Sequence, residues 1–294
     1  MTEVGAALRS YKIGGTPICW GFAEDEMPHG GQGQVLAPWP NRIASGRYVF
    51  GDTVGRAAID EPAFDNAIHG LVRWMTFRPV ALEPDVLRLE TLLHPQPAYP
   101  FDLLLSVEYR LVADGCEVTT EARNLGDRPA PFGLGFHDYL DAGPGAVDGA
   151  ELDVRARTRL LLDGRRLPVG EETVAGTPFA AISPHGSCRR PIGALRLDDC
   201  FGDLERDAED IWHATFVRGG GPLDTIEVWA DGSFSWAMVY SGDTLAPAAR
   251  RRALAIEPMT CPPNAFRTGR DLIVLEPGAT FRGRWGIRLP RLQR

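Results

Sequence analysis

Short runs of alternating apolar and polar residues, flanking three Asp-Gly pairs, constrain the fold of this chain more than any other feature. Alternation with a period of two is typical of strands with one buried face, and Asp-Gly supplies the positive φ angles of a tight hairpin turn. The pairs are Asp114-Gly115, Asp163-Gly164 and Asp231-Gly232, flanked by residues 103–111 and 118–122, 159–162 and 167, and 226–230 and 234–238, respectively. We therefore expect three antiparallel hairpins.

The rest of the chain also favours strands. Apolar runs at residues 86–93 and 272–275 end beside Pro or Gly, and 33 Gly and 24 Pro interrupt the chain throughout. No long stretch repeats apolar residues with the helical spacing i, i+3, i+4, i+7, so we expect only short helical turns, at 61–66 and 197–207. No repeat or linker divides the chain. The pattern predicts one all-β domain over residues 1–294 and favours a β-sandwich over a barrel.

Composition excludes several classes of partner. The chain has 31 Lys and Arg against 39 Asp and Glu, a net charge of −8 without a basic run, which disfavours nucleic acid. No apolar run has the length of a membrane span, and residues 1–10 lack a signal-peptide pattern. We expect a cytoplasmic protein without a membrane partner, with five reduced cysteines that form no C-x-x-C pair: Cys19, Cys116, Cys188, Cys200 and Cys261.

Several common catalytic motifs are missing from the sequence. It contains no G-x-x-x-x-G-K-[ST], H-E-x-x-H or G-x-S-x-G, and Gly30-Gly31-Gln32-Gly33 is not a dinucleotide fingerprint. These absences disfavour a nucleotide-dependent enzyme, a zinc peptidase and an esterase. The polar residues that remain as candidates lie in segments 41–46, 67–74, 132–139, 197–201 and 255–266.

Glu257 is the first candidate for acid–base chemistry. It ends the apolar run that contains Leu254 and Ile256 and precedes Pro258, which holds it in an extended conformation. A carboxylate at a strand end beside a rigid loop can be partly desolvated, which raises its pKa and suits a general base. The alternative is a solvated surface glutamate.

His137 is the second candidate. It follows a Gly-rich approach and has Phe136 and Tyr139 nearby, which indicates close packing in a pocket. An imidazole with a pKa of about 6.5 can give a proton to a weakly basic oxygen at neutral pH. The same sequence surroundings also fit a buried structural histidine that is hydrogen-bonded to the backbone. His69 has the same two interpretations. The other histidines have polar or Pro-rich surroundings and are expected at the surface: His29, His94, His185 and His213.

Two histidines and a glutamate also suggest a metal site of the cupin type. His69 and His137 lack the close sequence pairing that such sites commonly have, which disfavours a metal. Trp39 and Trp74 either stack on the face of a sugar ring or belong to the core.

Taken in order, these segments resemble the aldose 1-epimerase family, also called galactose mutarotases, from about Gln34 to Leu289. One such segment alone is weak evidence for the family, but six segments in the same order are a specific match. The segments are Pro40-Asn41-Arg42-Ile43 with Gly46 and Tyr48, Ile68-His69-Gly70, Tyr99-Pro100-Phe101, His137 with Tyr139, Asp198 with Phe201, and the closing Glu257 segment.

The resemblance implies a large antiparallel β-supersandwich with few short helices. It also implies an isomerase that needs no cofactor or metal and interconverts the α and β anomers of a free hexose. Glu257 would take the proton of the anomeric hydroxyl, and His137 would protonate the ring oxygen. Arg42, His69 and Asp198 match the sugar-binding positions of the family. Asp198 is assigned in preference to Asp199 because the family has the spacing Asp-x-x-Phe, which ends here at Phe201. The partner would be a small sugar, and the protein a monomer or homodimer.

The chain departs from the family pattern in places that concern the substrate. Asp138 follows the second histidine where better-known members have a small residue or proline, and Pro-Met-Thr follows Glu257 instead of Thr-Gln or Ser-Gln. Segment 68–74 resembles a bacterial branch related to a sulfosugar mutarotase, in which Arg73 would meet an anionic group on C6. Otherwise Arg73 is a surface or salt-bridged arginine. Relatives also begin with one or two strands that this chain does not show before Thr2.

Two further functions stay open. A hexose-6-phosphate epimerase would need arginines to grip a phosphate, for which Arg73, Arg78 and Arg267 are available. A carbohydrate-binding sandwich without catalysis would keep the groove, although the presence of both Glu257 and His137 argues against it.

Overall fold

Two large antiparallel sheets form most of the computed structural model, which describes residues 1–181, 191–219 and 221–290. The ten-stranded sheet contains, in spatial order, β1 (Tyr11–Ile13), β2 (Thr16–Cys19), β14 (Tyr139–Asp141), β22 (Ala253–Met259), β21 (Trp236–Tyr240), β18 (Asp198–Leu204), β16 (Ala156–Leu162) and β17 (Pro168–Thr173), with β13 (Gly135–Phe136) between β22 and β3 (Val35–Leu36). The eight-stranded sheet contains β15 (Glu151–Asp153), β19 (Trp212–Val217), β20 (Thr225–Ala230), β24 (Thr280–Arg288), β11 (Gly115–Asn124), β10 (Leu103–Val112), β9 (Val86–Leu93) and β8 (Arg78–Leu82).

Smaller elements surround the two sheets. Three two-stranded sheets are formed by β4 (Arg42–Ala44) with β7 (Asn66–Ile68), β5 (Arg47–Phe50) with β6 (Thr53–Arg56), and β12 (Ala130–Phe132) with β23 (Ile273–Leu275). The helices of the described part are the single turn α1 (Ala265–Thr268) and four 3-10 turns, η1 (Pro62–Phe64), η2 (Val72–Trp74), η3 (Val147–Gly149) and η4 (Pro178–Ala181). The all-β class with few short helices is thus confirmed. None of the described helices is long and apolar enough to cross a membrane.

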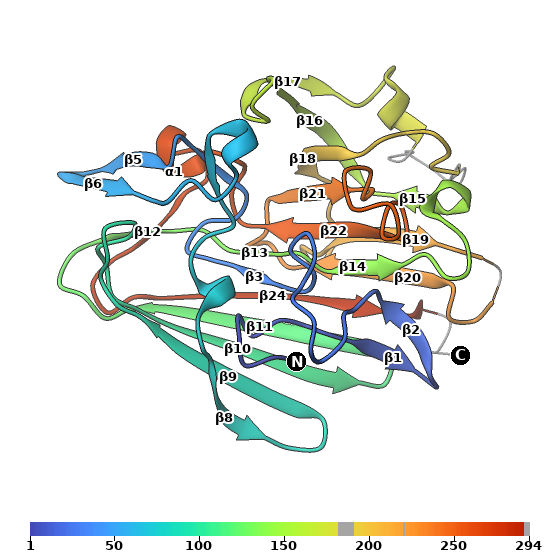
Figure 1. The fold of residues 1–294 in the computed structure, drawn as a ribbon, viewed down its shortest axis with the longest axis horizontal. Coiled ribbons are helices and arrows are strands. Elements are labelled where there is room, and N and C mark those ends of the chain that lie inside the picture. Colours follow the sequence, from blue (N-terminus) through green and yellow to red (C-terminus); the bar gives the residue numbers. More distant parts are fainter. Residues whose placement is uncertain (182–190, 220, 291–294) are drawn as a thin grey trace.

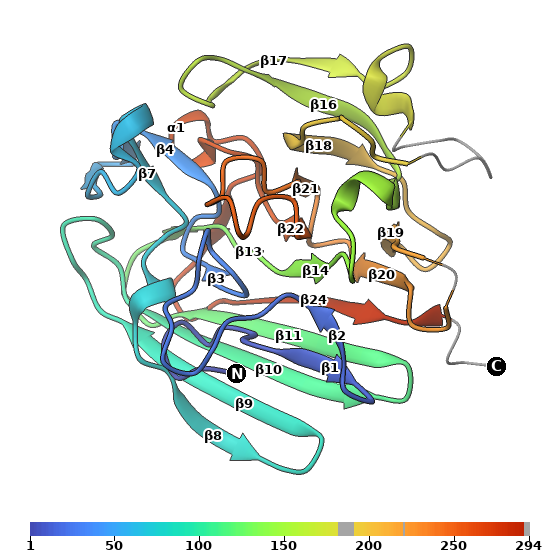
Figure 2. The ribbon, with the colours of Figure 1, turned by 45° about the vertical axis from the view of Figure 1, so that its right-hand side comes forward.

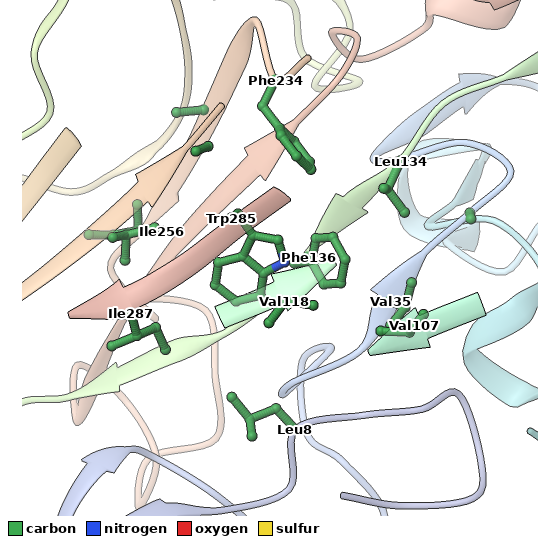
Figure 3. Close-up of a cluster of buried hydrophobic side chains, with 14 of the residues drawn as sticks. Leu8, Val35, Val107, Val118, Leu134, Phe136, Phe234, Ile256, Trp285 and Ile287 are labelled. Carbon is green, nitrogen blue, oxygen red and sulfur yellow. The ribbon is translucent and has the colours of Figure 1, made fainter. Parts of the chain in front are cut away.

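The main core lies between the two large sheets. In Figures 1 and 2 the ten-stranded sheet rises from β1 and β2 in the lower part of the view to β17 at the top, and the eight-stranded sheet rises from β8 at the bottom through β24 to β20 and β19. Trp285 and Ile287 of β24 face it from the eight-stranded sheet, while Phe136 and Ile256 face it from the other layer (Figure 3). The rings of Phe136 and Trp285 have centroids 4.8 Å apart. Because both layers contribute large apolar side chains to one contact surface, burial in this core is the dominant force holding the sheets together.

The ten-stranded sheet is also covered on its second face, which is where the polar candidates gather. Every residue of β22 is buried, and Met238 and Met259 belong to an apolar cluster separate from the main core. Alternation along β22 therefore directs Ile256 into the main core and Glu257 to the opposite face, where the register pairs it with Met238. A carboxylate on this face is removed from water without entering the main core.

Two of the three expected hairpins form, and the third does not. β10 pairs with β11 across the first Asp-Gly turn, and β16 pairs with β17 across the second. β20 and β21 instead lie in different sheets, so the chain crosses between layers at Asp231. The Asp231 carboxylate accepts hydrogen bonds from the backbone N–H groups of Ser233 and Arg284, and these bonds fasten the crossover to β24.

The two expected helical turns also have different outcomes. Residues 61–66 contain η1, as predicted. Residues 198–204 are strand β18 rather than helix, because their backbone pairs with β16 on one side and β21 on the other. The backbone hydrogen bonds to two neighbouring strands outweigh a weak local preference for helix.

Candidate active site

Glu257 lies inside strand β22, two residues before its end at Met259, rather than at the strand end expected from Pro258. Glu257 is 1% exposed, so the interpretation as a solvated surface glutamate is wrong. Within the described part of the chain, its Oε2 atom has no hydrogen-bond partner. A buried carboxylate with a free oxygen is poised to interact with a ligand.

His137 contacts Glu257 directly. It occupies the bend between β13 and β14, and its Nε2 atom lies 3.3 Å from Oε1 of Glu257. The ring stacks on that of Tyr139, with centroids 5.0 Å apart. It packs edge-to-face with the ring of His69, with centroids 5.2 Å apart. Nδ1 of His137 is buried without a partner among the described residues, which disfavours a structural histidine satisfied by backbone.

The glycine-rich segment that precedes β3 covers the imidazole of His137. The backbone N–H of Gly33 donates to the carbonyl of His137, and the N–H of His137 donates to that of Gln34. Gly31 has a φ of +84°, and a Cβ there would lie 2.8 Å from Cδ2 of His137. This segment therefore needs glycine both for its backbone conformation and for contact with the ring.

Arg42 and His69 come from the small sheet of β4 and β7. The register places Arg42 opposite Ile68, and the N–H of His69 donates to the carbonyl of Asn41. The guanidinium of Arg42 donates from Nε and Nη2 to the two carboxylate oxygens of Glu61, both at 2.8 Å. A bidentate pair fixes the plane of the guanidinium, so Arg42 is a rigid donor.

Asp198 begins β18 and lies beside Arg166, with 3.5 Å between Oδ2 and Nη1. The neighbouring Asp199 bonds instead to Arg159, at 2.7 Å. Only Asp198 of this adjacent pair lines the cavity described below.

Arg73 and Trp74 lie in η2 at the rim of the same cavity. Nη2 of Arg73 donates to Oδ2 of Asp60 at 2.5 Å, while its Nε has no partner in the described ranges. Trp74 is 47% exposed, whereas Trp39 is buried in the main core. Arg78 and Arg267, the other arginines considered for a phosphate, do not line this cavity.

These side chains enclose one cavity of about 340 Å³. Its lining combines the candidates from the sequence, both histidines included, with residues that sequence reasoning did not single out: Pro28, Gln34, Glu61, Phe64, Arg166, Met238, Tyr240, Thr244 and Leu245. A larger hollow of about 610 Å³ lies against β1, β9 and β10, but its lining is mainly apolar and includes neither histidine. The smaller cavity is the one that contains the candidate acid–base groups Glu257 and His137.

Burial controls the protonation of the paired groups. It raises the pKa of Glu257 well above its usual range, and the negative charge of Asp198 adds to this effect. Burial lowers the pKa of His137 to about 3 and that of His69 well below its ordinary value. Both shifts favour the uncharged forms of the pair, a protonated Glu257 and a neutral His137.

Two other sequence expectations concern metal binding and surface histidines. The described ranges contain no group of three His, Cys, Asp or Glu side chains placed to hold a metal. His29 and His94 are exposed as expected, but His213 is largely buried between Asp207 and Glu227. His185 and Cys188 lie outside the described residues.

Glu61 and Arg166 are the functional candidates that sequence reasoning missed. Glu61 orients Arg42 from a turn nineteen residues away, and Arg166 reaches Asp198 from the turn between β16 and β17. Their partners are distant in sequence, so no local pattern marks them.

Comparison with known proteins supports the fold and the family. The sequence model of the family "Aldose 1-epimerase" matches residues 1–288. The uncharacterized protein YihR of Escherichia coli strain K12 is 33% identical over 283 residues, which cover 96% of this chain and 87% of that protein.

Solved structures extend the comparison to the whole fold. A GalM/aldose epimerase homologue from C. elegans superposes with a TM-score of 0.82 at 17% identity, covering 97% of this chain and 93% of that one. Galactose 1-epimerase from Lactobacillus acidophilus gives a TM-score of 0.77 at 20% identity, covering 97% and 89% of the two chains. The β-supersandwich expected from the sequence is thus confirmed.

Proposed function

Because this chain belongs to the aldose 1-epimerase family, we propose that it interconverts the α and β anomers of a free hexose by acid–base catalysis. Membership of the family supports an isomerase with a small sugar as substrate. The observation that carries the finer proposal is the 3.3 Å contact between Nε2 of His137 and Oε1 of Glu257 at the cavity wall.

Ring opening uses both members of the pair. Glu257 removes the proton from the anomeric hydroxyl while His137 gives a proton to the ring oxygen. The bond between C1 and the ring oxygen then breaks, and C1 becomes an aldehyde. Concerted transfer avoids a free alkoxide, and each group contributes roughly 10²- to 10⁴-fold to the rate.

Ring closure reverses the roles. After rotation about the C1–C2 bond, the hydroxyl formed from the ring oxygen attacks the other face of the aldehyde. His137 accepts the proton of that hydroxyl, and Glu257 returns a proton to the new anomeric oxygen. Both groups end each cycle in their starting protonation states, so the reaction consumes no co-reactant.

The single proton of the pair is sufficient for this cycle. Opening requires Glu257 as carboxylate and His137 as imidazolium, and this form differs from the neutral pair only by one proton moved across the 3.3 Å contact. The positive charge of Arg42 lowers the pKa of Glu257 and therefore favours the carboxylate. Arg42, His69 and Asp198 are assigned to hold the sugar hydroxyls.

The charges of the lining favour a neutral sugar. Arg42 is paired with Glu61, Arg73 with Asp60 and Arg166 with Asp198. Paired arginines still offer N–H donors to hydroxyl groups, but the neighbouring carboxylates repel an anion.

One observation favours a second candidate, an epimerase of sugars with an anionic group on C6. Nε of Arg73 is buried, has no partner among the described residues, and belongs to a side chain that lines the cavity. A sulfonate or phosphate group on C6 could accept a hydrogen bond from this N–H. Mutarotation of glucose 6-phosphate measured beside that of glucose separates the two candidates.

Two further expectations remain proposals. We infer one domain over residues 1–294, which the family match across 1–288 supports. We also infer a cytoplasmic protein with reduced thiols, a proposal supported by the four described cysteines, all free and buried.

The test of catalysis is the approach of freshly dissolved α-D-glucose and α-D-galactose to anomeric equilibrium, followed by polarimetry or proton NMR. We expect acceleration by the wild type and loss of at least about 100-fold in Glu257→Gln, which keeps the shape but removes the base. Glu276→Gln, at an exposed glutamate that does not line the cavity, is the matched control.

Each alternative gives a different result. Full activity of Glu257→Gln would remove Glu257 as the base. Acceleration confined to anionic sugars would establish the second candidate. Sugar binding by the wild type without acceleration of any sugar would establish a carbohydrate-binding protein.

A further inference from the structure

Strand β8 ends the eight-stranded sheet, and no strand within the described ranges pairs with its outer edge. Figures 1 and 2 both show β8 at the border of the molecule, with no labelled element beyond it. The N-terminal segment pairs with the chain just before this strand, through the bridge between Val4 and Thr76. From Arg78 onward the outer side of β8 is therefore an edge to which another strand can add.

The turn after β8 shows which backbone groups point outward. Glu83 and Val86 exchange both of their backbone hydrogen bonds at this turn. Bonded and non-bonded positions alternate along an antiparallel pair, so the N–H and carbonyl of the preceding Leu82 point away from β9. Pro79 has no N–H, and proline in a sheet is typical of an edge strand. Leu82 thus offers both a donor and an acceptor to an added strand.

Apolar side chains are exposed on both faces of the sheet beside this edge. Leu82 is 79% exposed and borders the apolar hollow that lies against β1, β9 and β10. Val80 is 53% exposed and borders a hollow of about 610 Å³ on the other face, together with Leu92 and Leu104. A strand added to β8 would cover apolar surface on both faces, which favours a protein strand as the occupant.

The two ends of the edge carry opposite charges. Arg78 begins β8 and Glu83 follows its last residue, and both are exposed. In the part of the chain that the structure describes, neither side chain takes part in an ion pair. A strand with a positive charge at one end and a negative charge at the other is complementary to an antiparallel copy of itself. A second copy of this chain is therefore the occupant that the edge fits.

The faces of β8 select the register of such a pair. Pro79 and Leu82 pair with leucines of β9 and share the side of the main core. Arg78 and Ala81 pair with charged residues of β9 and share the opposite side, since the strand has a bulge between Pro79 and Ala81. Directly opposite residues of an antiparallel pair lie on the same face. Like faces meet when Pro79 of one copy lies opposite Leu82 of the other, and this register also places Arg78 opposite Glu83.

We propose that two copies of this chain form a dimer by antiparallel pairing of their β8 strands, about a two-fold axis between Val80 and Ala81. The two eight-stranded sheets then form one continuous sheet, and each Arg78 contacts Glu83 of the other copy. Pairing of two identical edges closes after two copies, so it does not extend into fibres. No residue of β8 lines the candidate active-site cavity, so the dimer is independent of the proposed reaction.

The first test is sedimentation velocity of the full chain over a range of about 1 to 200 µM, which spans the affinities of weak interfaces. We expect a reversible dimer with a dissociation constant on the order of 10 µM, because a strand of 5 residues buries less surface than a standard interface. High salt should weaken the dimer, since the two contacts between Arg78 and Glu83 lie at the surface.

Two single variants and their mixture test the register. Arg78→Glu places two carboxylates opposite each other at both ends of the pair, and Glu83→Arg places two guanidinium groups there. Each variant alone should raise the dissociation constant about tenfold or more. In an equal mixture both contacts again join opposite charges, so a heterodimer should form with roughly the affinity of the wild type. The double variant restores both contacts in one chain and should dimerise in the same way.

Arg123→Glu is the matched control, at an exposed arginine of β11, an interior strand of the same sheet. It should leave the dissociation constant unchanged, and thermal melting verifies that each variant is folded. A wild type that is monomeric throughout the range would overturn the inference. A dimer that persists in both single variants would also overturn it, because that dimer uses another surface. Dissociation of both single variants without recovery in either the mixture or the double variant would contradict the proposed register.

Discussion

The imidazole of His137 and the carboxylate of Glu257 behave as one titrating unit. Burial lowers the pKa of the imidazole to about 3 and raises that of the carboxyl well above its ordinary 4.5. The unit therefore takes up a second proton only below about pH 3, and above that pH the raised pKa of Glu257 favours the form with one proton. It loses that last proton as the pH rises through the elevated pKa of Glu257.

This protonation predicts the pH profile of the proposed reaction. We expect kcat/KM to stay level from neutral pH down to about pH 4 and to fall on the alkaline side, where the pair loses its proton. The measurement is enzymatic mutarotation between pH 4 and 10, corrected for the reaction in buffer alone. An acid limb centred near 4.5 would show that Glu257 is ionised in the free enzyme and would contradict this expectation.

Gly31 gives a test of how accurately the imidazole must be placed. A Cβ at Gly31 would lie 2.8 Å from Cδ2 and 3.2 Å from Nε2 of His137, so Gly31→Ala must displace the ring from its present position beside Glu257. We expect kcat to fall roughly 10- to 100-fold, because small displacements of reacting groups are costly.

Gly15→Ala is the control for this variant. Gly15 has the same φ of +84° but no atom within 4 Å of the added Cβ, so it introduces the backbone strain without the contact. Both variants should lose about 1 kcal/mol of stability from the left-handed backbone, and only Gly31→Ala should lose activity. Equal activities would remove Gly31 from the positioning of His137.

The strand β7 connects the sugar-binding candidates to the rest of the fold through Asn66. This side chain is fully buried, and its Nδ2 donates to Oε2 of Glu61 and to the carbonyl of Arg165. Glu61 in turn holds Arg42. One amide thus joins β7, η1 and the turn between β16 and β17.

Asn66→Ala should loosen all three elements together. We expect a loss of about 2 kcal/mol of unfolding free energy, since two partly buried acceptors lose their donor. KM for the sugar should rise more than kcat falls, because Arg42 is displaced while the pair of His137 and Glu257 is untouched. Urea unfolding and steady-state mutarotation check both parts. A fall in kcat at unchanged KM would place the effect in the catalytic pair instead.

Local and distant interactions explain which elements could be predicted. The β10–β11 hairpin was predictable because its two strands and its turn are contiguous in sequence. The pairing of β21 with β18 and β22 was not, since Asp231-Gly232 serves a crossover as readily as a hairpin. Strand β18 likewise depends on neighbours remote in sequence, which a reading of residues 197–207 alone does not contain.

The candidate site follows the same division. Glu257, His137, Arg42 and His69 each lie in a distinctive segment, and the structure brings these four together with Asp198. Glu61 and Arg166 lie in turns without such a pattern, and only their contacts with Arg42 and Asp198 mark them. Burial of Glu257 was also unpredictable, because it depends on what covers the second face of the ten-stranded sheet.

The fold also buries Asp138, a carboxyl group that the proposed reaction does not use. It is 3% exposed, and neither carboxylate oxygen has a partner in the described part of the chain. Burial raises its pKa from 3.8 to about 7. The folded protein thus retains a proton on Asp138 between about pH 4 and 7 that the unfolded chain has released, so this group makes stability fall as the pH rises through that range.

His137 acts in the opposite direction over nearly the same range. Its pKa is about 3 in the folded protein and 6.5 ordinarily, so the unfolded chain binds a proton that the folded protein does not. Stability from this group therefore falls as the pH decreases from 6.5 towards 3. Between about pH 4 and 6.5 the two slopes oppose each other, and the wild type shows only their difference.

Asp138→Asn should separate these slopes, because asparagine keeps the shape but cannot ionise. Relative to the wild type, its free energy of unfolding should be nearly constant below pH 4 and then rise, reaching a gain of about 4 kcal/mol by pH 8. Urea unfolding of both proteins from pH 4 to 8.5 measures this difference, with Asp127→Asn at an exposed aspartate as the control. A difference independent of pH would show that Asp138 is ionised in the fold and has a partner there, since a lone buried carboxylate must release its proton at a cost that grows across this range.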